Sequence, residues 1–151
     1  MNKTARSIST LFGIGYVRYA PGTVASIVAL PFAWGMAITG GRFVLLLAGI
    51  LALAIGAWAS ELYANQTRTF DPRECVIDEL AGQWIACAFA PVTLPGFGLA
   101  FVLFRIFDIT KPWPIRHVEQ LHGGFGIMAD DVVAALMAGA ILVVLSHVGL
   151  I

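Results

Sequence analysis

The stretch 23–60, TVASIVALPFAWGMAITGGRFVLLLAGILALAIGAWAS, decides the fold of this chain. It contains two uncharged apolar runs, Thr23 to Gly40 and Phe43 to Ser60, which are separated by Gly41 and Arg42. Each run approaches the ~20 residues that a helix needs to cross a bilayer. The stretch therefore predicts a tight hairpin of two membrane helices.

Two further apolar runs follow. Val132 to Ile151 contains no Asp, Glu, Lys or Arg and is long enough for another crossing. Leu80 to Phe104 is also free of these residues, but PVTLPG at 91–96 interrupts its middle. Proline breaks helices and glycine favours turns. This run is therefore either one kinked crossing or a hairpin of two short helices.

The basic residues favour the hairpin interpretation of 80–104. With that hairpin, eight of the nine Lys and Arg residues lie on the side of the N-terminus, and Arg42 lies on the other side. The positive-inside rule then places the N-terminus in the cytoplasm. Each short helix would reach only ~18 Å, less than the bilayer core. We therefore expect these helices to tilt or to form a re-entrant pair shielded by the others.

The composition agrees with a membrane protein. The chain has 151 residues, of which 59% are hydrophobic and 12% charged, whereas soluble domains carry about a quarter charged residues. A net charge of zero leaves no basic face for nucleic acid. The chain is thus expected to be all-α and polytopic, with about five membrane helices in one domain over 1–151 and membrane lipids as its surroundings.

Acidic residues gather in one part of the chain. All nine lie within 61–131, and the hairpin topology puts all nine in loops or helix ends on the cytoplasmic side. Five of them stand where a loop meets a membrane helix, as two adjacent pairs and one single residue. These five are Asp78, Glu79, Asp108, Asp130 and Asp131.

Carboxylates at such junctions are costly to desolvate and repel one another. A shared Mg²⁺ ion would resolve both problems, because it binds carboxylate oxygens, waters and phosphate oxygens. An acid before an apolar helix can also act simply as an N-cap. The second acid in each pair favours shared metal ligation.

Two basic residues flank Asp108, Arg105 three residues before it and Lys111 three residues after it. Residues i and i+3 share a helix face, so Arg105 should point to the same place as Asp108. A guanidinium forks onto phosphate oxygens and a lysine supplies a mobile point charge. The alternative is that both side chains snorkel to lipid headgroups.

Two glycine-containing segments and two single residues complete the candidates. The loop HGGFGIMADD at 122–131 could offer N–H groups to a phosphate, or be an ordinary turn, and His122 is a possible proton shuttle or a solvated loop residue. In FGIGYVRYAPGT at 12–23, Thr23 is expected to be an N-cap. Trp113 is expected to anchor at the membrane interface, and Cys75 to be structural.

Four blocks together resemble the phosphatidylglycerophosphatase A family, and they span most of the chain. They are FGIGYVRYAPGT at 12–23, DPRECVIDELAGQW at 71–84, FRIFDITKPWPI at 104–115 and GGFGIMADD at 123–131. The resemblance implies an all-helical bacterial inner-membrane enzyme that hydrolyses phosphatidylglycerophosphate to phosphatidylglycerol and phosphate with Mg²⁺. It carries the acidic sites of the family onto the five acids at the helix junctions.

The expected roles follow. Mg²⁺ is assigned to Asp78, Glu79, Asp108, Asp130 and Asp131; catalysis to Asp108, Asp131 and Lys111; and binding of an anionic phospholipid to Arg105, Lys111 and Thr23. Water would attack the lipid phosphorus directly, or it would hydrolyse an aspartyl-phosphate that forms in a first step.

Other functions stay open from the sequence. They are hydrolysis of another lipid phosphate or pyrophosphate, exchange of a CDP-alcohol, and a non-catalytic role as a transporter or assembly subunit. The gathering of acids at one face, with uncharged helix centres, disfavours transport.

Overall fold

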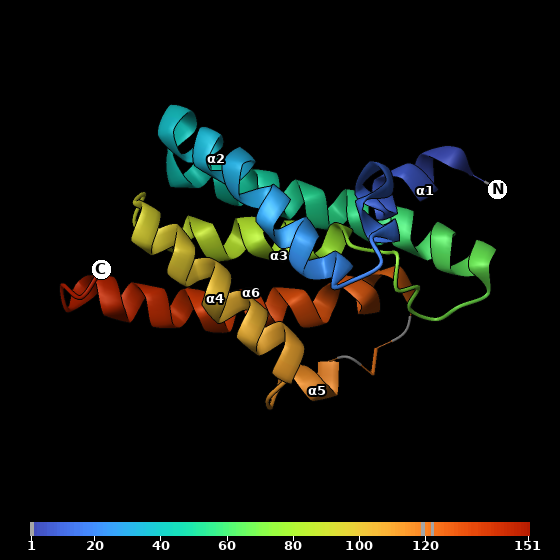
Figure 1. Ribbon diagram of the computed structural model, residues 1–151. Coiled ribbons are helices and arrows are strands. Elements are labelled where there is room, and N and C mark those ends of the chain that lie inside the picture. Colours follow the sequence, from blue (N-terminus) through green and yellow to red (C-terminus); the bar gives the residue numbers. More distant parts are fainter. Residues whose placement is uncertain (1, 119, 122) are drawn as a thin grey trace.

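The computed structural model describes residues 2–118, 120–121 and 123–151, and all regular structure in this part of the chain is helical. The predicted all-α class is confirmed. The long helices run roughly along one direction and reverse at each connection (Figure 1). In chain order they are α1 (Lys3–Ser9), the 3₁₀ helix η1 (Leu11–Tyr16), α2 (Pro21–Thr67), α3 (Ile77–Ala88), α4 (Leu94–Thr110), α5 (Ile115–Val118) and α6 (Gly123–His147).

Helix α2 is the predicted hairpin. Its backbone leaves the helical region at Gly41, where φ is 75° and ψ is 178°. A positive φ is easily adopted by glycine and costs other residues energy. The break divides α2 into legs 21–40 and 42–67, which fold back on each other in Figure 1.

The run 80–104 also forms a hairpin rather than one kinked crossing. Helix α3 ends at Ala88 and α4 begins at Leu94, and the two run in opposite directions (Figure 1). The Thr93 hydroxyl accepts a hydrogen bond from the Gly96 N–H at 3.1 Å and so caps α4. The interrupting PVTLPG segment therefore provides a turn and a helix start.

The prediction of about five membrane helices is not confirmed. Two helices, α2 and α6, are long and apolar enough to cross a bilayer, and α2 contributes two legs. Helix α3 has 12 residues and α4 has 17, so they reach ~18 Å and ~26 Å of a core ~30 Å thick.

Small residues allow the helices to approach closely. Leg 21–40 buries a stripe of alanines at a spacing of four, Ala25, Ala29, Ala33 and Ala37. The Trp84 indole of α3 donates a hydrogen bond to the Ala29 carbonyl of this leg at 3.0 Å. Large apolar side chains instead cover the outer faces of α2 and α6. Packing through small residues with bulky residues outside is typical of helices in lipid.

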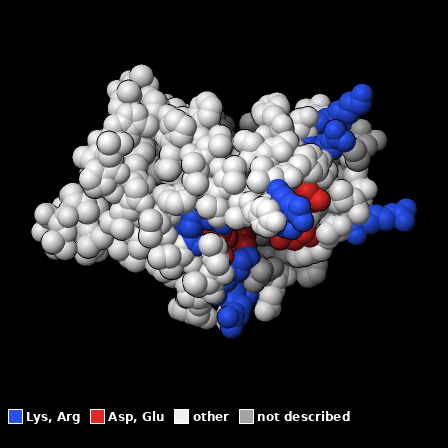
Figure 2. All heavy atoms as spheres, viewed as in Figure 1, with Lys and Arg blue, Asp and Glu red and all other residues white. Residues whose placement is uncertain are grey.

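The alternating directions bring four helix ends together. The starts of α2, α3 and α6 lie near the end of α4, whereas the Gly41 turn, residues 89–93 and the C-terminus lie at the opposite end (Figure 1). On the face in Figure 2, acidic atoms lie recessed among Lys and Arg side chains, and the end with the C-terminus is uncharged. Trp113 is 76% exposed, as expected of an interface anchor.

Gly82 is the point where three of these helices meet, and it generates a stability prediction. A Cβ there would lie 2.7 Å from the ring of the buried Phe104 of α4 and 3.2 Å from the Asp131 carbonyl of α6. Gly82→Ala should therefore destabilise the protein by about 1–3 kcal/mol through overpacking. Gly98→Ala, in open space on α4, is the control and should not lower the unfolding temperature. Thermal unfolding in detergent checks this; equal midpoints would contradict it.

Candidate functional site

A pocket of ≈ 270 Å³ lies where the four helix ends meet. It draws on α2, α3, α4 and α6 and on the loop before α3. All five junction acids line it, so acids up to 53 positions apart in the sequence share one cavity. The lining residues are Ala20, Pro21, Gly22, Asp71, Pro72, Arg73, Cys75, Asp78, Glu79, Arg105, Asp108, Lys111, Asp130 and Asp131.

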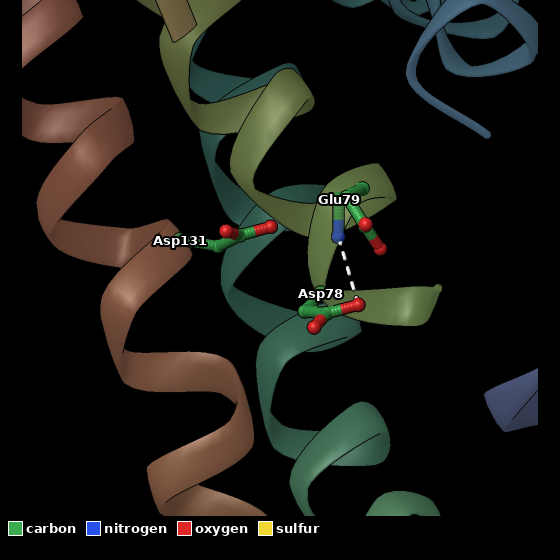
Figure 3. Close-up of side chains that lie close together, drawn as sticks. All are labelled: Asp78, Glu79 and Asp131. Atoms are coloured by element: carbon green, nitrogen blue, oxygen red, sulfur yellow. Dashed lines mark hydrogen bonds between the residues drawn. The ribbon is translucent and has the colours of Figure 1, made fainter. Parts of the chain in front are cut away.

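Three of the acids form a cluster that we call the carboxylate triad: Asp78, Glu79 and Asp131. Each offers one oxygen, and these oxygens lie within 4.8 Å of one another. Asp78 and Glu79 come from the first turn of α3, and Asp131 reaches toward them from α6 (Figure 3). The Asp78 carboxylate accepts the Glu79 N–H at 3.1 Å, which satisfies one of the free N–H groups in the first turn of α3.

The triad fits a divalent cation. Glu79 Oε2 and Asp131 Oδ2 are buried and accept no hydrogen bond from the described residues. Asp131 is 2% exposed, and a buried carboxylate oxygen without a partner is costly. The ligands are all carboxylate oxygens, which Mg²⁺ prefers to nitrogen and sulfur.

Asp108 lies beside the triad but is paired with Arg105. The Arg105 Nη1 is 2.5 Å from Asp108 Oδ2 and 3.9 Å from Glu79 Oε1, and Nη2 donates to the Thr23 hydroxyl at 3.3 Å. The i, i+3 spacing thus does put Arg105 and Asp108 on one face. Asp108 also interacts electrostatically with Asp131. Arg105 therefore partly neutralises this edge of the acidic cluster.

Asp130 is paired with the second cation. Lys111 Nζ lies 2.6 Å from Asp130 Oδ2, and Asp130 Oδ1 accepts the Asp131 N–H at 3.0 Å. Lys111 ends α4 in the left-handed region, with φ of 43°, which few residues other than glycine adopt. This turn directs the chain end of α4 toward the start of α6. The structure therefore divides the five acids into a triad and two ion-paired aspartates.

The start of α2 packs directly against the triad, which sequence reasoning missed. A Cβ on Gly22 would lie 1.9 Å from Glu79 Oε1, so the missing side chain makes room for this carboxylate. The helix begins after Ala20, with Pro21 in its first turn and no side-chain cap. The prediction that Thr23 is the N-cap is wrong, because Thr23 lies inside the helix. The uncapped N–H groups give this edge of the pocket a partial positive charge.

Residues 123–131, which were predicted to be a glycine loop, form the first turns of α6. The Gly124 N–H donates a hydrogen bond to the Glu61 carboxylate of α2, and Gly123 has a positive φ of 83°. Neither residue lines the pocket. The prediction of a loop is therefore wrong from Gly123 on, the two glycines form no phosphate cradle in this pocket, and His122 lies outside the described residues.

Four residues in the loop before α3 line the pocket as well, namely Asp71, Pro72, Arg73 and Cys75. Arg73 was assigned no role from the sequence; its Nη2 donates to the Arg18 carbonyl at 2.8 Å. Cys75 is buried and its Sγ lies 3.0 Å from the Ser60 hydroxyl. Burial raises the pKa of the Cys75 thiol to about 12. A thiol that stays neutral is a poor nucleophile, which agrees with the structural role expected for Cys75.

Comparison with known proteins identifies the family to which this chain is similar. Residues 7–146 match the phosphatidylglycerophosphatase A family. A phosphatidylglycerophosphatase A of Escherichia coli K12 is 36% identical over 138 residues, 90% of this chain and 80% of its own. One of Haemophilus influenzae is 36% identical over 129 residues, 84% of this chain and 79% of its own. A Bacteroides thetaiotaomicron protein, provisionally assigned as a phosphatidylinositol-3-phosphatase, is 34% identical over 147 residues, 91% of this chain and 90% of its own. No solved structure matches significantly.

The contact between Gly22 and Glu79 generates a prediction about cation binding. In Gly22→Ala the new methyl group displaces the Glu79 carboxylate, and Mn²⁺, used as a spectroscopic probe for Mg²⁺, should bind roughly 10–100-fold more weakly. Gly35→Ala, on the same leg with no atom near the added Cβ, should bind Mn²⁺ like the unaltered protein. Electron paramagnetic resonance of free Mn²⁺ measures both; equal affinities would show that Glu79 does not position a cation.

Proposed function

The chain belongs to the phosphatidylglycerophosphatase A family and is a phosphatase, and from this premise we propose that it hydrolyses phosphatidylglycerophosphate to phosphatidylglycerol and phosphate. The observation that carries the proposal is the carboxylate triad beside Arg105 and Lys111 in one pocket at the end of apolar helices. A lipid phosphate monoester combines a charged group and an apolar body in the same way. Its charged group would lie in the pocket while its apolar body stays beside the helices.

The triad would hold Mg²⁺. When bound, the ion would supply positive charge that neutralises the developing charge on the phosphoryl oxygens and acidifies a water. The orphaned oxygens of Glu79 and Asp131 support this assignment. Asp108 and Asp130, which the sequence also suggested as ligands, would instead hold the two basic side chains in place.

Arg105 and Lys111 would bind the phosphate. Their ion pairs fix both cations at the pocket wall before the substrate arrives. Donors held in place in this way need little reorganisation during the reaction, which is the main source of electrostatic stabilisation in enzymes. The uncapped start of α2 adds a further partial positive charge on the same wall.

We propose direct attack by water. The water oxygen forms a bond to phosphorus as the bond from phosphorus to the glycerol oxygen breaks. Asp108, beside the triad, takes the proton of the water, and Lys111 gives a proton to the departing glycerol oxygen. This assignment leaves Asp131 in the triad and involves no covalent aspartyl-phosphate.

The proposed location is the bacterial inner membrane, with the pocket at the cytoplasmic face. Helices α2 and α6 are long and apolar enough to span it. The charged side chains visible in Figure 2 lie toward the pocket end, which is the distribution that the positive-inside rule describes. Exposed Tyr19 and Trp113 flank the same end, where aromatic residues favour the interface.

A second headgroup is a specific alternative. The Bacteroides thetaiotaomicron relative covers this chain as fully as the two phosphatidylglycerophosphatases do. Its provisional assignment makes an inositol lipid phosphate the first competitor to test. Both substrates carry the same phosphate monoester, so the pocket chemistry would be shared. Recognition of the headgroup would then determine which substrate is preferred.

Substrate and metal dependence are tested together. We expect purified protein in detergent with Mg²⁺ to release phosphate from phosphatidylglycerophosphate at least about tenfold faster than from phosphatidic acid or phosphatidylinositol 3-phosphate. Excess EDTA should remove the activity, and added Mg²⁺ should restore it, because the triad alone repels an anionic substrate. Colorimetric phosphate release measures each rate. Unchanged activity in EDTA, or a preference for another lipid, would overturn this part of the proposal.

Carboxylate variants test the roles of the acids. Glu79→Gln, Asp108→Asn and Asp131→Asn should each lower kcat at least about 100-fold, because each removes a charge from the proposed reaction centre. Glu74→Gln changes an acid of the same loop region that does not line the pocket and should retain activity. Phosphate release, with gel filtration to confirm folding, distinguishes them. Full activity of Asp108→Asn would exclude Asp108 as the proton acceptor.

A further inference from the structure

An apolar groove of ≈ 380 Å³ lies beside the acidic pocket, between η1, leg 21–40 of α2, and α3. Its walls include Val28 and Phe32 from α2 and Leu80 and Trp84 from α3. Phe12 of η1 lines it as well and is 87% exposed. No charged side chain among the described residues lines this groove, in contrast to the neighbouring pocket.

The groove and the pocket share the same pair of helices. Gly22 of α2 and Glu79 of α3 touch in the pocket. Leu80, the next residue of α3, already lines the groove, and Val28 lies six residues beyond Gly22, ~9 Å along the helix. The Trp84 hydrogen bond to leg 21–40 holds the two helices together at this level. The groove therefore lies beside the pocket on the same two helices, on the side toward the Gly41 turn.

The backbone of η1 is held in a costly conformation at the groove. Leu11 and Phe12 have φ values of 46° and 55°, in the left-handed region that non-glycine residues rarely adopt. The Thr10 hydroxyl accepts the Gly13 N–H at 3.2 Å and so stabilises this turn. Residues in such sparsely populated conformations cluster at active sites and at segments that clamp ligands. Phe12 is one of these residues and lines the groove.

We propose that this groove binds one acyl chain of the lipid substrate while its phosphate lies in the acidic pocket; this rests on the proposed function. The lipid is favoured over other occupants because it joins a charged group to an apolar chain, and the pocket and the groove are lined by neighbouring residues of the same two helices. A bound peptide would need hydrogen-bond partners for its backbone, which this apolar lining lacks. Each methylene buried in the groove would strengthen binding about fourfold.

The proposal turns the groove into a determinant of substrate preference. The unaltered protein should hydrolyse long-chain phosphatidylglycerophosphate more efficiently than its deacylated, water-soluble counterpart, which carries the same phosphate. The measured quantity is the ratio of kcat/KM for these two substrates, at a fixed surface fraction of lipid in detergent micelles. The ratio separates binding of the chain from chemistry at the phosphate.

Filling the groove should lower that ratio. Val28→Phe places a ring in the groove, and the ratio should fall at least about tenfold, mainly through KM for the long-chain lipid. Ile27→Phe is the matched control, because Ile27 is the neighbouring residue, is 51% exposed and does not line the groove. Phe12→Ala removes an exposed ring, a change with little risk to folding, and should lower the ratio at least about threefold.

The outcomes separate the two proposals. If the unaltered protein releases phosphate from neither substrate, the proposed function fails. If it hydrolyses both with equal efficiency, or if folded Val28→Phe and Phe12→Ala keep its ratio within about twofold, the groove does not bind the chain and only this inference is overturned. An equal loss in Ile27→Phe and Val28→Phe would also overturn it, since the effect would not be specific to the groove.

Discussion

The rest of the structure depends on one constraint, the burial of like charges in apolar surroundings. Asp78, Glu79 and Asp131 bring carboxylates within 4.8 Å of one another, and two of their oxygens lack hydrogen-bond donors among the described residues. Such a cluster opposes folding unless positive charge compensates it. The short α3–α4 hairpin, the uncapped start of α2 and the two cations of α4 all converge on this place. The packing of these helix ends therefore holds together three carboxylates that would otherwise repel one another.

Apolar packing contacts and most of the charged residues occupy opposite ends of the long helices. Toward the Gly41 turn, the helices contact one another through alanines and large apolar residues. Toward the pocket, every helix presents a terminus, so polar backbone groups and charged side chains can satisfy one another. Helices too short to span a bilayer are useful in this arrangement. Their ends bring Asp78 and Asp108 together beneath the surface, where other helices shield them from lipid.

Much of this arrangement was accessible from the sequence. The uncharged runs broken at Gly41 predicted the first hairpin, because apolar length and helix breakers act locally. For 80–104 they left one kinked crossing or a hairpin open, and the positions of the basic residues favoured the hairpin. The i, i+3 spacing of Arg105 and Asp108 predicted that they share a helix face, but it did not predict their ion pair. Contacts between distant segments were not predictable in this way. The fit of Gly22 against Glu79 and the pairing of Lys111 with Asp130 depend on how helices pack. Thr23 failed as an N-cap because the strained Ala20 starts the helix three residues earlier.

The charge of the pocket suggests an order of events. Six carboxylates and three basic side chains line it, which leaves a formal charge of −3 if all are ionised. A phosphate monoester brings further negative charge, so the basic side chains alone cannot make the pocket attractive to it. The two aspartates outside the triad already occupy Arg105 and Lys111. The rest of the charge is on Asp71, Arg73 and the triad, in which Glu79 also lies 3.9 Å from Arg105 Nη1. A cation that compensates the triad would have to bind before or with the lipid. In this view the ion pairs keep the basic groups in place, and binding of an anion depends on whether the negative charge of the triad is compensated.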